Sequence, residues 1–243
     1  MITGRCAQSQ RLCGTVDDCA AETVCLWSGT VFSKYRTYLF FGAPGSGKGT
    51  QGKALGAVPR FYHCACGDVF RSMDTRTPLG RAFVDYSSRG QLVPDELTVE
   101  LWKSSIERAV DAGAFKPDID HLILDGIPRN VRQAGLMQEI IDVRRVFHLS
   151  CPDRSRIVAR LKKRAIKDNR LDDASEEVIH RRLETYEAES KPMLDFYGSD
   201  LVVPVDATEP PVVVMHKILS SIVKDRHREE DFTEFAPSQN VAV

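Results

Sequence analysis

The sequence predicts an α/β fold in which a five-stranded parallel sheet is the middle of three layers, with helices on both faces. Five short apolar runs rich in β-branched and aromatic residues are separated by longer segments with helical periodicity. Strands that alternate with helices form βαβ units, and these give parallel sheets whose two faces are both covered. A glycine-rich turn between the first strand and the first helix narrows the prediction to a phosphate-loop fold.

Each predicted strand is a short apolar run that ends near a polar residue or a glycine. The five runs are residues 38–41, 61–64, 121–124, 146–149 and 201–205. Helical patterns fill the intervals at residues 48–57, 79–88, 95–112, 131–143, 154–166, 175–197 and 212–223. Because the interval between the second and third strands is helical throughout, we expect it to form a flap over the carboxyl edge of the sheet.

The two ends of the chain lack this pattern. Residues 1–35 are rich in Ser, Thr, Gly and Cys without a sustained period, and we expect a poorly ordered N-terminal extension. Residues 36–224 are the predicted folded domain. The polar and charged residues 225–243 are expected to form a solvated, mobile tail.

Composition excludes several classes of protein. The 243 residues include 33 Lys plus Arg and 34 Asp plus Glu, so the formal net charge of -1 gives no case for a nucleic-acid or membrane-surface partner. No apolar run approaches the roughly 18 residues of a membrane helix. The seven cysteines have neither the spacing of a zinc site nor the density of a disulfide scaffold. No secretory leader is recognisable, so we expect a cytoplasmic protein with buried thiols.

The glycine-rich turn has the spacing G-x4-G-K, in which backbone N–H groups surround phosphate oxygens and the helix N-terminus adds a favourable partial charge. Lys48 is expected to place its ammonium on the β and γ phosphates. The general pattern continues with a Ser or Thr that binds magnesium, whereas this chain has Gly49 and then Thr50. The loop residues predicted to bind a nucleoside triphosphate are Gly42, Ala43, Pro44, Gly45, Ser46, Gly47, Lys48, Gly49 and Thr50.

Further motifs follow this loop in a fixed order. They are GKGTQ at 47–51, GDVFR at 67–71, GQLVPD at 90–95, DGIPR at 125–129 with Gln133-Ala134 after it, and NRLDD at 169–173. Over about residues 36–223 the sequence resembles the nucleoside monophosphate kinases, and adenylate kinase in particular. The resemblance implies a sheet core, a helical monophosphate-binding flap at 67–96 and a short lid at 165–174 without the zinc of longer lids. It also implies a monomer that uses Mg²⁺ and reversibly converts ATP and AMP into two ADP.

On the donor side, the resemblance implies that Arg160 lies against the base of ATP, whereas Arg164, Arg170 and Arg182 converge on the transferring phosphoryl group. The register leaves Arg181 as a competitor of Arg182. Asp125 follows the third predicted strand and would hold Mg²⁺ through bound water, so no direct protein ligand is expected. The acidic pair of the lid is implied to help close it, and consists of Asp172 and Asp173.

On the acceptor side, Arg71, in a helix expected to open at Asp68, and Arg129 are implied to grip the monophosphate, since two planar guanidinium groups suit a phosphate dianion. The amide of Gln133 can donate and accept together, which suits the edge of adenine. The predicted AMP-binding residues are Cys66, Arg71, Leu92, Val93, Gly126, Arg129 and Gln133.

Alternatives remain at the level of the acceptor and of activity. Cys66 stands where adenylate kinases usually carry Thr, and Asn130 is reminiscent of pyrimidine kinases, so a UMP/CMP kinase is the alternative to AMP. A catalytically silent nucleotide sensor and a small-metabolite kinase are the others. Phosphoryl transfer asks for positioning and charge neutralisation rather than a protein nucleophile. The predicted catalytic residues are Lys48, Arg129, Arg164, Arg170 and Arg182.

Overall fold

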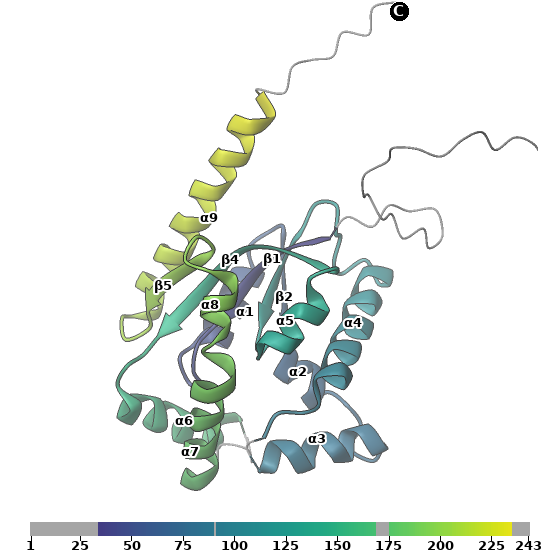
Figure 1. The fold of residues 1–243 in the computed structure, drawn as a ribbon, viewed down its shortest axis with the longest axis vertical. Helices are drawn as coiled ribbons and strands as arrows, with labels where there is room; N and C mark the ends of the chain where they lie inside the picture. Colours follow the sequence, from purple (N-terminus) through teal and green to yellow (C-terminus); the bar gives the residue numbers. More distant parts are fainter. Residues whose placement is uncertain (1–33, 90, 169–174, 235–243) are drawn as a thin grey trace, which may run out of the picture. The chain divides into compact units, whose positions relative to one another are not determined.

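The computed structural model describes residues 34–89, 91–168 and 175–234, with side chains up to residue 225 except at residues 79 and 168 (Figure 1). Residues 34–234 belong to one unit. The predicted extension, apart from residues 34 and 35, lies outside the described residues, as do residues 169–174 of the predicted lid and the chain after 234.

The centre of the fold is a five-stranded sheet whose order is β2-β3-β1-β4-β5 and whose neighbouring strands all pair in parallel. This confirms the predicted α/β class and all five predicted strands. Their bounds are β1 Tyr35–Phe41, β2 Phe61–Ala65, β3 His121–Asp125, β4 Ile141–Ser150 and β5 Val202–Asp206.

Strands β1 and β4 both begin earlier than predicted, and for a shared reason. Tyr35 pairs with Ile141, and Thr37 pairs with Val143, so each early segment gives the other its backbone hydrogen bonds. The predicted helix 131–143 is therefore wrong at its end: α5 covers only Val131–Met137. The apolar residues after Met137 fit a helical period. Their β-branched side chains favour a strand, however, and β1 is available to pair with them.

Three other helix predictions need correction. The predicted helix 175–197 is divided into α7 (Glu176–Thr185), a π-helical turn η2 (Tyr186–Ser190) and α8 (Met193–Tyr197). The last helix, α9 (Pro211–Glu234), continues well past its predicted end at 223, into the residues predicted to form the polar tail. The short helix α2 (Cys66–Arg71) starts at Cys66 rather than at Asp68.

The remaining helices match their predicted segments closely. They are α1 (Lys48–Gly56), α3 (Pro78–Ser88), α4 (Asp95–Asp111) and α6 (Arg154–Asp168). None of the helices in the described ranges combines the length and the apolar character needed to cross a bilayer.

Alternation along the strands produces two apolar layers, one on each face of the sheet. On one face, buried residues of the strands pack with buried residues of α1 and α9. This layer includes Tyr38, Phe40, Leu55, Ile123, Phe147, Val214 and Ile218. On the other face, buried residues of the strands pack with α4, α5 and α8, and this layer includes Leu39, Phe41, Trp102, Ile106, Leu122, Leu124, Met137 and Met193. The three-layer prediction is therefore confirmed (Figure 1).

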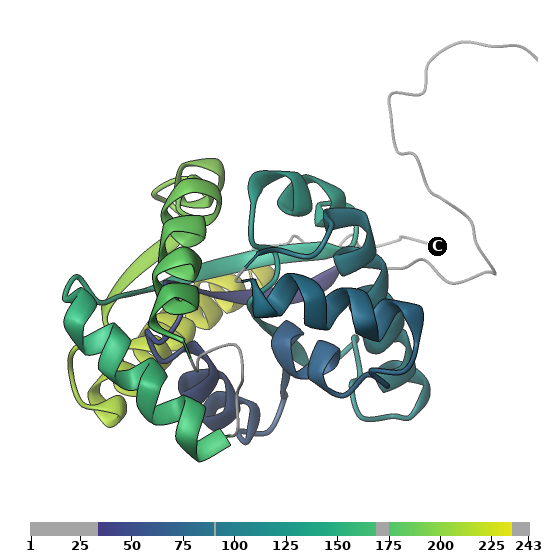
Figure 2. The same ribbon diagram turned by 90° about the horizontal axis from the view of Figure 1, so that it is seen from below.

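Helices α6 and α7 lie on one side of the carboxyl edge of the sheet, and α2, α3 and α4 lie on the other (Figure 2). Helices α6 and α7 share a small apolar cluster of their own, formed by Ile157, Leu161, Ile179 and Leu183. The carboxyl edge between these two groups of helices is where ligands bind in open parallel sheets.

Candidate active site

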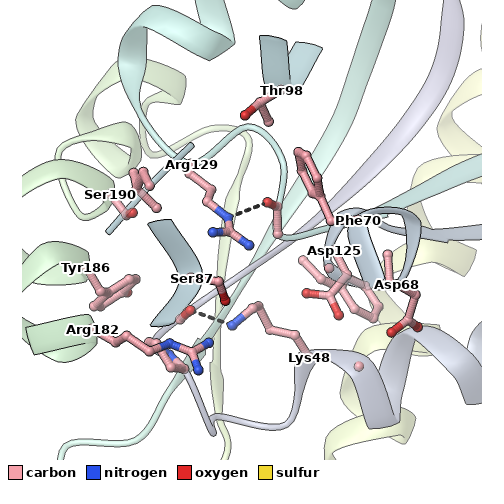
Figure 3. Close-up of a pocket in the computed structure, with 18 of the residues that line it drawn as sticks. Lys48, Asp68, Phe70, Ser87, Thr98, Asp125, Arg129, Arg182, Tyr186 and Ser190 are labelled. Carbon is pink, nitrogen blue, oxygen red and sulfur yellow. Dashed lines mark hydrogen bonds between the residues drawn. The ribbon is translucent and has the colours of Figure 1, made fainter. Parts of the chain in front are cut away.

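A cavity of about 430 Å³ opens at the carboxyl edge of the sheet (Figure 3). This volume lies in the range typical of small-molecule sites. The walls come from the loop before α1, the end of β3, the helices α2–α4 and the segment α7–η2. Among the lining residues are Gly42, Pro44, Lys48, Gly49, Thr50, Asp68, Arg71, Leu92, Val93, Asp125, Gly126, Arg129, Gln133 and Arg182.

The glycine-rich loop has the backbone that its sequence requires. Gly42 has a φ of 143° and Gly47 a φ of 104°, a region that side chains other than glycine rarely enter. A β-carbon on Gly42 would also collide with the Leu149 carbonyl oxygen of β4. The predicted loop residues Ala43, Gly45, Ser46 and Gly47 shape the turn but are not among the cavity-lining residues.

The ammonium of Lys48 points into this cavity (Figure 3). Its Nζ donates hydrogen bonds to the carbonyl oxygens of Gly42 at 2.7 Å and Ala43 at 3.0 Å. Burial lowers its pKa from 10.5 to about 8; Asp125 opposes that shift, whereas the positive charges of Arg129, Arg164 and Arg182 add to it. An ammonium with two partners keeps one N–H for another acceptor, and an anion in the cavity would raise its pKa again.

Asp125 is the last residue of β3, and it pairs with Phe40 in β1 and with Ala65 in β2. Its Oδ2 would lie 3.3 Å from a β-carbon built on Gly49, a tighter spacing than most real contacts. A Ser or Thr at position 49 would therefore crowd this carboxylate, which gives a physical reason for the glycine. The described residues contain no cluster of three or more His, Cys, Asp or Glu side chains for a metal.

Two arginines from different elements line the other end of the cavity. The Arg71 guanidinium donates to Asp68 Oδ1 at 2.6 Å, and Arg129 Nε donates to the Gly126 carbonyl oxygen at 2.8 Å. Each bond fixes one side of a planar group and leaves other N–H groups available. Arg129, Arg182 and Lys48 point toward a common space, with Asp125 beside it (Figure 3). This arrangement can neutralise several phosphate groups at once.

Gln133 lines the same end of the cavity and is only 1% exposed. Its Nε2 donates to Asp95 Oδ1 at 2.8 Å, and its Oε1 accepts from the Arg129 backbone N–H at 2.8 Å. Leu92 and Val93 line this end as well. The amide therefore reaches the cavity with part of its hydrogen-bonding capacity already used.

Beyond the four loop residues, three more predicted site residues in the described part of the chain are not among the cavity-lining residues. Cys66 is 1% exposed in the apolar core, and burial raises the pKa of its thiol to about 11. Arg160 donates to the Ala207 carbonyl oxygen at 3.0 Å, beside the end of β5. Arg164 is half-buried on α6, near enough to lower the pKa of Lys48.

The structure separates Arg182 from its competitor Arg181. Arg182 lines the cavity, whereas Arg181 donates to Glu177 at 3.1 Å and to the Arg89 carbonyl oxygen at 3.2 Å. The remaining predicted lid residues lie outside the described residues; they are Arg170, Asp172 and Asp173.

Several cavity-lining residues were not predicted, although one of them, Phe70, lies within the GDVFR motif. Phe70 and Phe83 stack with ring centroids 4.9 Å apart and give one end of the cavity an apolar wall. Tyr186, on the π-helical turn, has its hydroxyl 3.2 Å from His148 Nε2. Thr98 and Ser190 are buried polar residues of α4 and η2. Apart from the motif around Phe70, the sequence contains no local signal for these residues.

Comparison with known proteins agrees with this geometry. Residues 40–202 match the family model for adenylate kinase. The chain is 37% identical to adenylate kinase 1 of a Nostoc species over 166 residues, which is 66% of this chain and 83% of that relative. It is 36% identical to an adenylate kinase of a Synechococcus species over 165 residues, covering 65% and 81% of the two chains.

A further relative is matched over almost its whole length. The adenylate kinase of Streptomyces coelicolor is 31% identical over 219 residues, covering 76% of this chain and 97% of that relative. The family match spans the phosphate loop, Arg71, Arg129 and Arg182, all of which the structure brings together at the carboxyl edge. The chain belongs to the adenylate kinase family.

Proposed function

We propose that this chain catalyses the reversible transfer of the γ-phosphoryl group of ATP to AMP, giving two ADP. The observation that carries the proposal is the convergence of Lys48, Arg129 and Arg182 on the cavity that contains the Asp125 carboxylate. Phosphoryl transfer needs positioning and charge neutralisation around an in-line displacement. Three cations from three separate elements supply both.

We assign the phosphate loop and Lys48 to the donor triphosphate. The backbone N–H groups at the start of α1 face the carboxyl edge, where a helix N-terminus favours anions. The third N–H of Lys48 would reach the β and γ phosphates. Arg164 and Arg182 are assigned to the transferring group by the resemblance and by their effect on the pKa of Lys48. Arg170 is assigned to the same group, and Arg160 to the base of ATP, by the resemblance alone.

We assign Arg71 and Arg129 to the acceptor phosphate, and Gln133 with Leu92 and Val93 to its base. An oxygen of the acceptor phosphate attacks the γ-phosphorus, and the bond from that phosphorus to the bridging oxygen breaks. Charge then moves onto the leaving β-phosphate, where Lys48 stabilises it. Arg129 and Arg182 neutralise the oxygens of the transferring group, so the protein needs no nucleophile of its own.

We propose that Mg²⁺ accompanies ATP and is held mainly by phosphate oxygens and water. The fit rests on the Asp125 carboxylate, which lines the cavity, whereas the described residues form no group of three or more His, Cys, Asp or Glu side chains that could hold a metal by themselves. Mg²⁺ keeps several waters and needs only one or two carboxylates beside phosphates. When bound, it supplies neutralisation of charge on the β and γ phosphates, and Asp125 would orient its waters.

We further propose the division into a flap at 67–96 and a lid at 165–174, each closing over the cavity to exclude water. The flap part rests on Arg71, Leu92 and Val93, which line the cavity from either end of that segment. We also propose a monomer in a reducing, cytoplasmic setting; the free thiols of Cys64, Cys66 and Cys151 support the reducing setting. Light scattering on a size-exclusion column tests the monomer.

The reverse reaction tests the proposal, because it needs only one nucleotide. The purified chain is incubated with ADP and Mg²⁺, and the nucleotides are separated by anion-exchange chromatography. We expect ATP and AMP to appear in equal amounts, with no formation of either by the Lys48→Met variant. Release of AMP and inorganic phosphate without ATP, or no reaction at all, would overturn the proposed function.

A further inference from the structure

Two protein groups form hydrogen bonds with the side-chain amide of Gln133, and each of them can act only as a donor or only as an acceptor. A carboxylate such as that of Asp95 only accepts hydrogen bonds, and the Arg129 backbone N–H only donates. Nε2 of Gln133 must therefore face Asp95, and Oε1 must face the Arg129 N–H, as observed at 2.8 Å for both contacts. The chemistry of the two partners therefore determines which end of the Gln133 amide is the nitrogen and which is the oxygen.

Asp95 also holds the segment that carries Gln133. Its Oδ1 accepts from Asn130 Nδ2 at 3.0 Å, and Asn130 Oδ1 in turn accepts from the Gln133 backbone N–H at 2.9 Å as the cap of α5. One carboxylate oxygen, at the start of α4, therefore restrains both the backbone and the side chain of Gln133. Asp95 itself lines a neighbouring groove rather than the nucleotide cavity.

We infer that Asp95 is a positioning residue that sets base selectivity by fixing the orientation of the Gln133 amide. This inference rests on the proposed function, because it concerns the acceptor site of that reaction. With the amide fixed, its second N–H and the second lone pair of Oε1 are the groups left for a base. Adenine offers an acceptor at N1 and a donor at N6, which complements this pair.

Hypoxanthine is the matched opposite of adenine, because it has the same size but a donor at N1 and an acceptor at position 6. Against a fixed amide, IMP would meet donor with donor and acceptor with acceptor. Against an amide free to rotate by half a turn, IMP would be accepted. The ratio of kcat/KM for AMP to that for IMP therefore reports how firmly Gln133 is held, and a merely structural defect would not move it.

The test measures this ratio in wild type and in Asp95→Ala, Asp95→Asn and Glu96→Ala. Asp95→Ala removes one of two restraints on the amide, so we expect the ratio to fall about tenfold. Asp95→Asn retains a carbonyl oxygen where Oδ1 stood, so it should keep the ratio within about threefold. Glu96 neighbours Asp95 and pairs with exposed Arg132 of α5 without contacting Gln133, so its variant should leave the ratio unchanged.

Equal losses with AMP and IMP in Asp95→Ala, leaving the ratio at its wild-type value, would overturn the inference. Asp95→Ser keeps an oxygen at the helix N-terminus but is one carbon shorter, and it replaces Asp95→Ala if that variant does not fold. A wild-type chain without turnover on AMP would instead refute the proposed function. In that case the same comparison by calorimetric binding of AMP and IMP tests Asp95 alone: a preserved binding ratio in Asp95→Ala overturns its role.

Discussion

Lys48 Nζ lies 2.7 Å from the carbonyl oxygen of Gly42, the first residue of the loop that Lys48 closes. The same glycine has a φ of 143° and leaves no room for a side chain against β4. The lysine and the backbone that holds it are therefore one unit: the loop turns at Gly42, and the carbonyl exposed by that turn orients the ammonium. Several predictions of function and stability depend on this unit and on the arginines around it.

Replacing Lys48 by Met should lower turnover by about a thousandfold or more, because a fixed cation on the transferring phosphate is lost. The variant should melt no lower than wild type at pH 7, since burial disfavours the ammonium and lowers its pKa to about 8. Turnover and melting curves measured together check both parts. Lys103→Met, at an exposed position on α4, is the control and should retain activity. Near-normal turnover of Lys48→Met would refute the role assigned to Lys48.

The activity of the free enzyme toward ATP should decline as the pH rises above about 8. Below the folded-state pKa of Lys48, about 8, the group is a cation; above it, the neutral amine cannot bind phosphate charge. Because bound phosphate raises that pKa, kcat should persist to a higher pH than kcat/KM for ATP. Initial rates across pH 6 to 10 at saturating AMP, with the coupling enzymes in excess, measure both curves. Profiles that coincide, or a kcat/KM that stays level through the alkaline range, would contradict this assignment.

Arg182 and its neighbour Arg181 should differ sharply. Arg182→Ala should lower kcat by about a hundredfold, since it removes a cation that faces the transferring group. Arg181→Ala removes bonds to Glu177 and to the Arg89 carbonyl at the surface, and should cost less than about threefold. Steady-state kinetics of the two variants side by side give the answer. The reverse order would show that Arg181, and not Arg182, faces the phosphates.

Arg129→Lys should raise KM for AMP by about tenfold or more while the protein remains folded. A lysine is a point charge and cannot hold a phosphate with two parallel N–H groups, nor keep the bond from Nε to the Gly126 carbonyl. Arg132→Lys, on the exposed side of the same segment, is the matched control. If both variants raised KM for AMP alike, the assignment of Arg129 to the acceptor phosphate would be wrong.

Gly52→Ala should destabilise the domain by about 1–3 kcal/mol. A β-carbon at Gly52 would overlap the imidazole of His63, which packs against α1 from β2. Chemical denaturation of the two single variants and of Gly52→Ala with His63→Ala forms a double-mutant cycle. We expect the double variant to be more stable than the sum of its parts by about 1 kcal/mol, since truncating His63 makes room for the new methyl group. Additive losses would show that the two residues are not coupled.

The sequence was sufficient for the fold where local pattern and tertiary context agree. All five strands and the phosphate loop have apolar runs and glycines that require their conformations. The prediction of a helix was wrong at 138–143. These residues fit a helical period, but Ile141 pairs with Tyr35 in the sheet, a contact between segments far apart in the chain. The prediction was wrong again after 223, because polar residues that continue a helix look the same as a solvated tail.

The candidate site divides in the same way. Lys48, Arg71, Arg129 and Gln133 stand in ordered motifs, and the cavity contains all four. Asp95 also lies in a motif. The role inferred for it depends on the hydrogen bonds that the side-chain amides of Asn130 and Gln133 donate to one carboxylate oxygen, and the spacing in the sequence does not reveal these contacts. Phe70, Phe83 and Tyr186 line the cavity only because helices from distant segments converge there.

The most direct measurement is a coupled assay with magnesium-ATP as donor and AMP, dAMP, CMP, UMP, GMP or IMP as acceptor. The fixed amide of Gln133 and the proposed roles of Arg71 and Arg129 at the acceptor phosphate predict the highest kcat/KM for AMP, with IMP at least about tenfold slower. Faster turnover with UMP or CMP would agree with the proposed phosphoryl transfer but contradict the proposed recognition of adenine by Gln133. No turnover with any acceptor, in a protein that binds ATP, would contradict the central claim and favour a silent nucleotide sensor.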